Sequence, residues 1–420
     1  MFFNKIKTIN LEIFFIVLMF FTGGSLVKII FSVEIDLLIL LIAVLIIYGH
    51  KFKINLDRDN ITYYIFLSTV FIFVLSIIFS SIYVSDGDWV RLFKYISLLP
   101  FSIFIYGFIS KEVILNYPKY YSTIIYYFTI LAIISTIYMY LGGSEIYSFT
   151  RGNREYINYY FTWTIRQDGV DSTIINMFDF TIKRMQSFYE EPGTFGVLIP
   201  PALIYAIYKS NIAMTFILLI GLFLTFSIGA WIIALLLFIL FFKELIENKL
   251  LLLVFFLLFL VLIILFYEQL WHIIQLKFGT SDIKGSGHSY AAREGVMTTT
   301  LEAIKNIGFF GFGASVKEQY YLYQVNTGTF FPHFVRGGLV GFIAFLFLYI
   351  ILSYCFIKLY LTKGKGDNIF YAALIFTIIV ASPQRATFMD SYFMMANVII
   401  MYKYFYISKK EGVLTNLKFQ

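Results

Sequence analysis

The chain has 420 residues, of which 60% are hydrophobic and only 14% are charged, and its formal net charge is +7. A soluble globular domain carries about 25% charged residues. The composition therefore excludes an ordinary soluble domain and indicates a polytopic membrane protein. The single cysteine excludes a disulfide framework and a cysteine-based zinc site. The sequence also has no phosphate-binding loop and no dinucleotide fingerprint.

Apolar segments of about 20 residues, the length that crosses a bilayer, recur along the chain. The first has no small-residue cleavage pattern and a second follows at once, so a cleaved signal peptide is not expected. We predict an all-α fold, a single integral membrane domain over 1–420. It has twelve transmembrane segments, near 11–31, 35–49, 61–83, 91–109, 122–141, 195–208, 212–225, 229–243, 249–267, 337–357, 368–382 and 390–407.

The apolar run 212–242 is too long for one upright helix, because its 31 residues would extend about 46 Å. Its middle reads "LTFSIGAW" and brings Ser227 and Gly229 together. We prefer two short helices that meet there. One long tilted helix is the alternative.

Lysine-rich segments alternate with acidic or neutral ones, and positive charge in short loops marks the cytoplasmic side. Lys5, Lys51, Lys111 and the lysines of the C-terminal tail all fall on one side. Both termini are therefore predicted to be cytoplasmic. Two long loops, 142–192 and 269–335, are predicted to be external. The spans are nearly free of charge, apart from Lys28 and Glu268 near their ends.

The nine arginines are distributed unevenly. Only Arg58 lies in a predicted cytoplasmic loop. Membrane orientation depends only on positive charge, which lysine or arginine can supply. The planar guanidinium of arginine, in addition, binds phosphate or carboxylate through two parallel hydrogen bonds. We interpret the outer face as a site for an anion; solvated loop charge and lipid headgroup contacts are the alternative. The arginines at or beyond the outer face are Arg91, Arg151, Arg154, Arg166, Arg184, Arg293, Arg336 and Arg385.

A lipid-linked diphosphate sugar is an anion that fits a membrane enzyme without a nucleotide site. The polyprenyl diphosphate would serve both as the membrane anchor and as the leaving group. Its departure needs charge neutralisation more than it needs a general acid, and arginines can supply that charge.

The stretch "RMQSFYEEPGTFG" ends the first long loop and joins Arg184 to two adjacent glutamates and a proline. Pro192 disfavours helical geometry at Glu191, so the span is predicted to start after the proline. We interpret the stretch as a polar lip of an external site. Glu191 is the candidate catalytic carboxylate, and Glu190 is a candidate binding residue.

The second long loop contains a predicted interfacial helix over 294–308, which has apolar residues at helical spacing and ends at Gly308. Arg293 would lie at its N-terminal end, where a cation is unfavourable, and this favours a ligand-binding role. His333 lies four residues before the next span and is the candidate that accepts a hydroxyl proton or orients the acceptor. His288 is the competing histidine.

Three stretches resemble the superfamily of O-antigen polymerases and O-antigen ligases. These are "RMQSFYEEPGTFG", "LTFSIGAWIIALLLF", and "REGVMTTTLEAIKNIGFFGFGAS" followed by "FPHFVRGGLVGFIAFL". The resemblance covers roughly residues 180–345. Two departures are present: Ile228 replaces a common arginine, and Phe334 replaces the asparagine that usually follows the histidine.

The resemblance implies a glycosyltransferase that uses undecaprenyl-diphosphate-linked glycans as donor and acceptor at the outer face of a bacterial inner membrane. It assigns Arg184 and Arg293 to substrate binding, His333 to function and Glu191 to the acidic position before proline. No metal or other cofactor and no nucleic acid is expected, and a chain-length regulator protein is a further candidate partner. The remaining predicted substrate-binding residues are Arg336, Arg385, Arg166, Glu190 and Arg91.

Three alternatives accompany the predicted polymerase of lipid-linked repeat units. A ligase would transfer the glycan to a lipid core. A metal-dependent glycosyltransferase would use the acidic pairs Glu34/Asp36 or Asp86/Asp88. A polysaccharide lipid transporter is less favoured, because a transport pathway needs charges within the spans.

Overall fold

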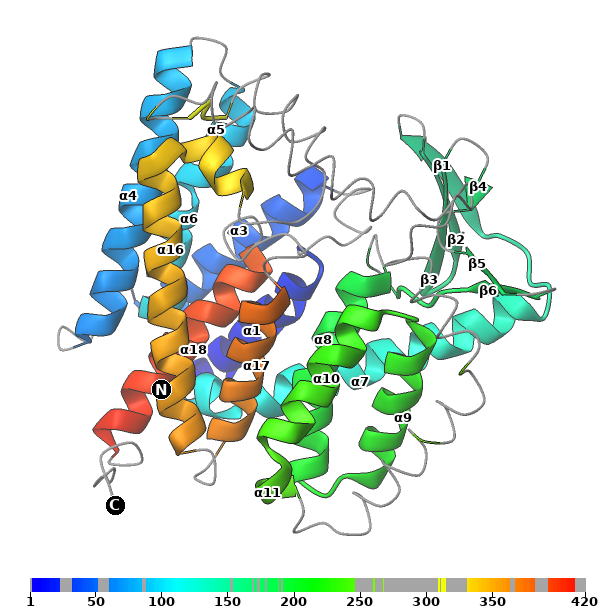
Figure 1. Cartoon of the computed structure of the whole chain (residues 1–420). Helices are drawn as coiled ribbons and strands as arrows, with labels where there is room; N and C mark the ends of the chain where they lie inside the picture. The colour runs from blue at the N-terminus through cyan, green and yellow to red at the C-terminus, as the bar shows by residue number, and fades with distance from the viewer. Residues whose placement is uncertain are drawn as a thin grey trace.

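The computed structural model is mostly helical (Figure 1). It describes residues 2–22, 32–51, 60–84, 88–151, 154–167, 170–171, 174–177, 180–187, 189, 192–245, 260, 267, 309, 311–314, 331–362, 367–381 and 392–411. The helices are α1 (Phe2–Phe20), α3 (Ser32–Gly49), α4 (Ile61–Val84), α5 (Trp89–Ile96), α6 (Leu98–Phe108), α7 (Lys111–Tyr140), α8 (Pro192–Tyr208), α9 (Ile212–Leu224), α10 (Ile228–Leu240), α11 (Phe242–Leu245), α16 (Phe331–Leu361), α17 (Asn368–Ala381) and α18 (Tyr392–Lys410).

Within the described ranges, three helices are long and apolar enough to cross a membrane. They comprise Ile61–Tyr83, Lys111–Tyr140 and His333–Leu361, in α4, α7 and α16. Several shorter apolar helices accompany them. The predicted set of spans is therefore found only in part. The predicted span 91–109 is divided between α5 and α6, and the predicted span 249–267 lies outside the described residues except at Leu260 and Tyr267.

The apolar run 212–242 contains two helices, as the preferred interpretation predicted. The first, α9, ends at Leu224, and α10 begins at Ile228. Between them Phe226 has a φ of 44°, in the left-handed region that L-residues seldom adopt. One residue in this conformation ends the helical hydrogen-bond pattern, so the alternative of a single tilted helix is wrong.

The first long loop contains strands, which the all-α prediction did not include. β1 (Tyr147–Arg151), β2 (Arg154–Tyr159), β3 (Thr162–Gln167) and β4 (Val170–Asp171) form an antiparallel sheet, and β5 (Ile174–Met177) pairs with β6 (Phe180–Lys183). β1 (YSFTR), β6 (FTIK) and the first four residues of β3 (TWTI) alternate apolar with polar residues, a pattern that favours strands. In Figure 1 the sheet lies at the C-terminal end of α7.

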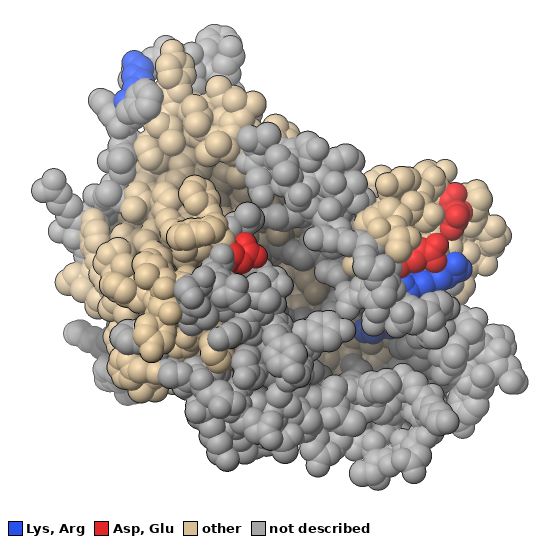
Figure 2. Space-filling view, turned by 90° about the horizontal axis from the view of Figure 1, so that it is seen from above, with Lys and Arg blue, Asp and Glu red and all other residues tan. Residues whose placement is uncertain are grey.

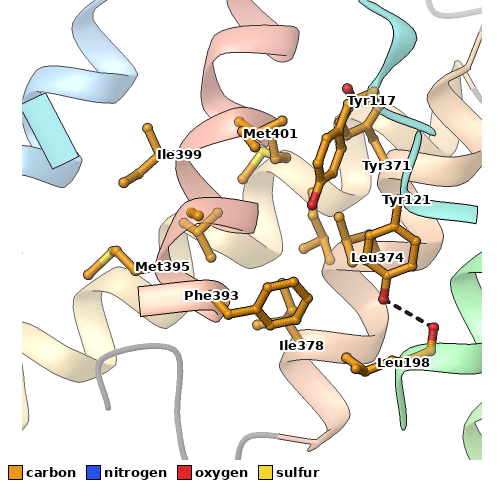
Figure 3. Packing of buried hydrophobic residues seen from close by; sticks show 14 of the residues in the cluster. Tyr117, Tyr121, Leu198, Tyr371, Leu374, Ile378, Phe393, Met395, Ile399 and Met401 are labelled. Atoms are coloured by element: carbon orange, nitrogen blue, oxygen red, sulfur yellow. Dashed lines mark hydrogen bonds between the residues drawn. The ribbon is translucent and has the colours of Figure 1, made fainter. Parts of the chain in front are cut away.

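Buried aromatic side chains hold the central helices together (Figure 3). Tyr121 of α7 donates its phenol hydrogen bond to the carbonyl oxygen of Leu198 in α8 at 3.1 Å. Tyr117 of the same helix donates to the side-chain oxygen of Asn397 in α18. Burying a phenol hydroxyl without a hydrogen-bond partner costs free energy. These two bonds therefore favour one arrangement of α7, α8 and α18.

Two charged side chains lie buried within apolar helices, contrary to the expectation that the spans carry charge only near Lys28 and Glu268. Glu12 of α1 accepts hydrogen bonds from the backbone N–H of Ser110 (2.7 Å) and from His50 Nε2 (2.8 Å). Lys403 of α18 donates to the carbonyl oxygens of Tyr106 and Ile109. The carboxylate therefore caps the start of α7, and the ammonium caps the end of α6.

Candidate functional site

Arg184 follows β6 directly and binds the break between α9 and α10. Its Nε donates to the carbonyl oxygen of Thr225 (3.1 Å), and its Nη2 donates to that of Phe226 (3.2 Å). The last carbonyls of a helix lack partners within the helix, and the helix dipole favours a cation there. Arg184 therefore caps α9 while its side chain stays partly exposed. The two bonds fix the plane of the guanidinium.

The N-terminal end of α10 begins at the same break. Ser227, its N-cap, has extended backbone geometry and makes no side-chain capping bond. α8 approaches this point at Gly196, where a Cβ would lie 3.0 Å from the Cβ of Ala230 and 3.2 Å from that of Ser227. The first N–H groups of a helix carry partial positive charge and bind anions. The break thus combines a helix N-terminus with the Arg184 cation.

Gln186 and Ser187, which the sequence analysis did not single out, add buried polar atoms beside Arg184. Both residues are fully buried. Within the described structure neither the Gln186 amide nor the Ser187 hydroxyl has a hydrogen-bond partner, an arrangement that costs about 1–3 kcal/mol per group. Ser187 also has a φ of 54°, and strained residues of this kind cluster at functional sites. Their polarity between Arg184 and the two glutamates was the available sequence signal.

Tyr189 fixes the end of this segment to the rest of the molecule. Its hydroxyl donates to the carbonyl oxygen of Phe20 in α1 at 3.1 Å, and its ring stacks with that of Phe195 in α8. Burial raises the pKa of Tyr189 above its ordinary value, so the phenol stays neutral and remains a hydrogen-bond donor at physiological pH.

A second region lies where α16 is interrupted at Gly338, with φ 59° and ψ −154°. The backbone N–H groups of Phe312 and Gly313 donate to the carbonyl oxygens of Val335 and Arg336, both at 2.8 Å. The segment 311–314 therefore satisfies carbonyl groups that the interruption exposes.

This segment must contain glycine, because it approaches other backbones closely. A Cβ at Gly311, where φ is 74°, would lie 2.7 Å from the carbonyl oxygen of Val335. A Cβ at Gly313, where φ is 62°, would lie 2.6 Å from Ser81 Cα in α4. Ala314 continues the connection by donating to Ser81 Oγ (2.9 Å) and accepting from the Asp88 N–H (2.6 Å). The two glycines thus join α16 to α4 and to the residue before α5.

The "RGGLVG" motif has a packing role in this region. A Cβ at Gly337 or Gly341 would lie 2.6 or 2.7 Å from Ser76 Oγ of α4. Small residues four positions apart allow two membrane helices to approach closely, and α4 and α16 run side by side in Figure 1. Close packing of α4 against α16 therefore explains these glycines, and no substrate contact is needed to explain them.

His333 lies inside this contact and is fully buried. Its ring stacks on Phe345 at a centroid distance of 4.0 Å and meets Phe73 of α4 edge-on at 5.4 Å. The predicted histidine is thus placed by aromatic packing between α4 and α16. Its predicted contact with an acceptor hydroxyl is not tested by this arrangement and stays a prediction.

Arg336 of α16 lies against α5, the helix that also carries Arg91. The guanidinium carbon of Arg336 lies 5.5 Å from the ring centroid of Tyr95, a cation–π distance. Arg91 precedes Tyr95 by one helical turn on α5. Lys94 of the same helix is exposed.

Arg166 lies on the sheet. It forms an exposed ion pair with Glu155 across β2 and β3, at 3.6 Å. Figure 2 shows few described charged residues on the face seen from above, with acidic and basic atoms side by side on the part of the surface formed by the strands. An exposed pair of this kind contributes at most about 1 kcal/mol to stability.

The Arg184 region and the His333 region are separate: α8–α10 and the contact between α5 and α16 stand apart in Figure 1. Several predicted residues lie outside the described part of the chain, so their placement relative to either region stays a prediction. These are Glu190, Glu191, Arg293, Arg385, His288, Asp86 and the interfacial helix 294–308.

The sequence matches no known protein-family model, and no curated protein is detectably similar to it.

Proposed function

We propose that the chain is a membrane glycosyltransferase that polymerises lipid-linked oligosaccharide units at the outer face of a bacterial inner membrane. The proposal includes the predicted twelve spans and the cytoplasmic placement of both termini. It is carried by one observation: Arg184 binds the α9–α10 break beside the N-terminal end of α10. The buried polar atoms of Gln186 and Ser187 follow Arg184 directly in the chain.

The chemistry of this break suits a diphosphate leaving group. In polymerisation, a hydroxyl of the acceptor sugar attacks the anomeric carbon of the donor, and the carbon–oxygen bond to the diphosphate breaks. Negative charge then grows on the diphosphate oxygens. A preorganised guanidinium and a helix N-terminus stabilise such charge without reorganisation in the transition state.

Arg184 is preorganised by its bonds to the helix end. A guanidinium has five N–H donors, and the bonds to Thr225 and Phe226 orient it through Nε and Nη2. We assign Arg293 as the second diphosphate ligand, with Arg336 or Arg385 assisting. His333 is assigned to the acceptor hydroxyl and Glu191 to acceptor positioning, so the proposal requires the separate Arg184 and His333 regions to face one substrate cavity.

The buried charges Glu12 and Lys403 bear on the transporter alternative. Ionisable residues inside a membrane protein frequently mark a transport pathway. Here both bind backbone groups on the two sides of the turn that joins α6 and α7. They serve as helix caps at a single place and do not form a series through the molecule, so the transferase is preferred.

The decisive experiment is deletion of the gene in the source bacterium, followed by analysis of surface glycolipid. A polymerase uses the same lipid-linked unit as donor and acceptor, so the deletion strain should carry single repeat units on its surface lipid. Bare lipid core, with polymer accumulating on the carrier lipid, would show a ligase instead. Full-length polymer in the deletion strain would refute both.

A further inference from the structure

The turn between β2 and β3, Tyr160–Phe161, lies against the side of α7. The backbone N–H of Phe161 donates to Ser135 Oγ at 3.0 Å, and the rings of Tyr160 and Tyr138 meet edge-on at 5.1 Å. Ser135 lies five residues before the last residue of α7, Tyr140. The turn therefore reaches about 7.5 Å back along the helix from its C-terminal end.

The turn is apolar and exposed at this depth. Tyr160 is 54% exposed and Phe161 is 36% exposed, and Ile134 and Ile137, which adjoin Ser135 and Tyr138 in α7, are 59% and 52% exposed. Because α7 is long and apolar enough to cross a membrane, its exposed side chains at this level would meet lipid. The exposed rings of the turn continue the same surface.

Charge is absent from the turn and concentrated at the opposite end of the hairpin. The ten residues 156–165, "YINYYFTWTI", contain no charged side chain. The Glu155–Arg166 ion pair closes the hairpin at the other end, about 15 Å away along the strands. The hairpin is therefore polar at one end and apolar at the other, as a segment that enters a membrane interface must be.

Side chains satisfy the backbone of the turn. The Asn158 side-chain amide donates to the carbonyl oxygen of Tyr160 at 2.9 Å, while Ser135 accepts from the Phe161 N–H. Water would satisfy these groups at no cost, but in the apolar layer each unpaired group costs several kcal/mol. Tyr160 also has a φ of 62°, a position where turns ordinarily use glycine or asparagine.

We infer that the β2–β3 turn is a membrane-inserted tip whose partner is the interfacial lipid of the outer leaflet. The inference rests on the membrane placement in the proposed function and not on the glycosyl transfer. The tip holds the sheet at a fixed depth.

Site-directed fluorescence in proteoliposomes tests this inference without any assay of activity. Tyr160→Cys and Thr150→Cys are labelled with an environment-sensitive maleimide dye. Thr150 is an exposed residue opposite Glu155 at the charged end of the sheet and is the matched control. The native Cys355 is buried, so labelling of the unaltered chain gives the background. Phe161→Cys is a second tip variant that keeps the backbone bond to Ser135.

Nitroxide placed on lipid near the headgroup should quench the tip probes severalfold more than the Thr150 probe, whereas aqueous iodide should quench Thr150 more. Equal quenching at the tip and at Thr150 would overturn the inference. Tip probes that are shielded from iodide but not quenched by nitroxide lipid would also overturn it, since they would indicate a protein partner or a second copy of the chain.

Discussion

Two helix breaks in this protein expose backbone carbonyl groups, and different groups bind these carbonyls at each break. At the α9–α10 break, the side chain of Arg184 binds the exposed carbonyl groups of Thr225 and Phe226. At the α16 break, backbone N–H groups of the segment 311–314 bind the carbonyls of Val335 and Arg336. The α9–α10 break depends on one particular side chain, that of Arg184. The α16 break depends on glycines, because a side chain in the segment 311–314 would prevent its close approach.

This difference separates two kinds of sensitivity to mutation. Around α16, glycines and a buried histidine hold helices together, so substitutions there should act first on stability. At the α9–α10 break, a partly exposed arginine lies beside a helix N-terminus, so substitutions there should act first on substrate.

Gly311→Ala should prevent correct folding. The new Cβ would clash with backbone and would occupy a left-handed conformation, which alone costs about 1–3 kcal/mol. Gly142→Ala is the matched control, because Gly142 has a φ of 80° but no heavy atom within 4 Å of the added Cβ. The amount of monodisperse protein in detergent measures the difference. Equal yields from the two variants would show that the segment 311–314 does not support α16.

Arg184→Lys should abolish most polymer formation while the protein is still produced. Lysine keeps the charge but loses the planar fork that binds two carbonyls and, as proposed, a diphosphate. Polymer length on gels of surface glycolipid is the measurement, with Arg58→Lys, at the predicted inner arginine, as control. Wild-type polymer from Arg184→Lys would remove the diphosphate assignment at this break.

His333→Phe separates packing from chemistry. Phenylalanine can keep the stacking on Phe345 and the edge contact with Phe73, so this variant should be as stable as the original chain. If the imidazole handles the acceptor hydroxyl, polymer is lost despite normal stability, which we expect. His333→Ala should lose both, through a cavity that costs about 3 kcal/mol. An active His333→Phe protein would assign the residue to packing alone, and His288→Ala should stay largely active.

Gln186→Leu should leave stability unchanged or raise it slightly. Replacing a buried amide that has no partner in the described structure by an apolar group of similar size removes a desolvation cost of about 1–3 kcal/mol. If the amide binds substrate, polymer formation should fall severalfold in the same variant. A stable variant with normal polymer would place Gln186 outside the substrate site.

Excess chelator should not change the activity of purified enzyme with lipid-diphosphate substrate. Arginines neutralise the leaving group in the proposed reaction, so a divalent ion has no required role. Activity that disappears in chelator and returns with magnesium would favour the metal-dependent alternative. It would direct attention to Asp86 and Asp88, where Asp88 adjoins the segment 311–314 through its backbone N–H.

The apolar helical character of the protein and the break near Ser227 are both visible in the amino-acid sequence. The sequence also marked Arg184 as a candidate ligand of an anion. These features are local. The spacing of apolar residues, the pair Ser227 and Gly229 inside an apolar run, and a charged residue beside an apolar segment can each be recognised within a short stretch of sequence. β1, β3 and β6 also show a short alternation of apolar and polar residues, but the helical pattern of the surrounding sequence obscured it.

Only the tertiary structure decided what those residues contact. No local pattern shows that Arg184 binds carbonyls more than 40 positions away, or that Ser76 of α4 requires glycine at 337 and 341. The burial of Glu12, Lys403 and His333 depends equally on helices distant in sequence. Partners are set by packing between remote segments, and the free energy of a buried polar group depends on the partner that packing provides.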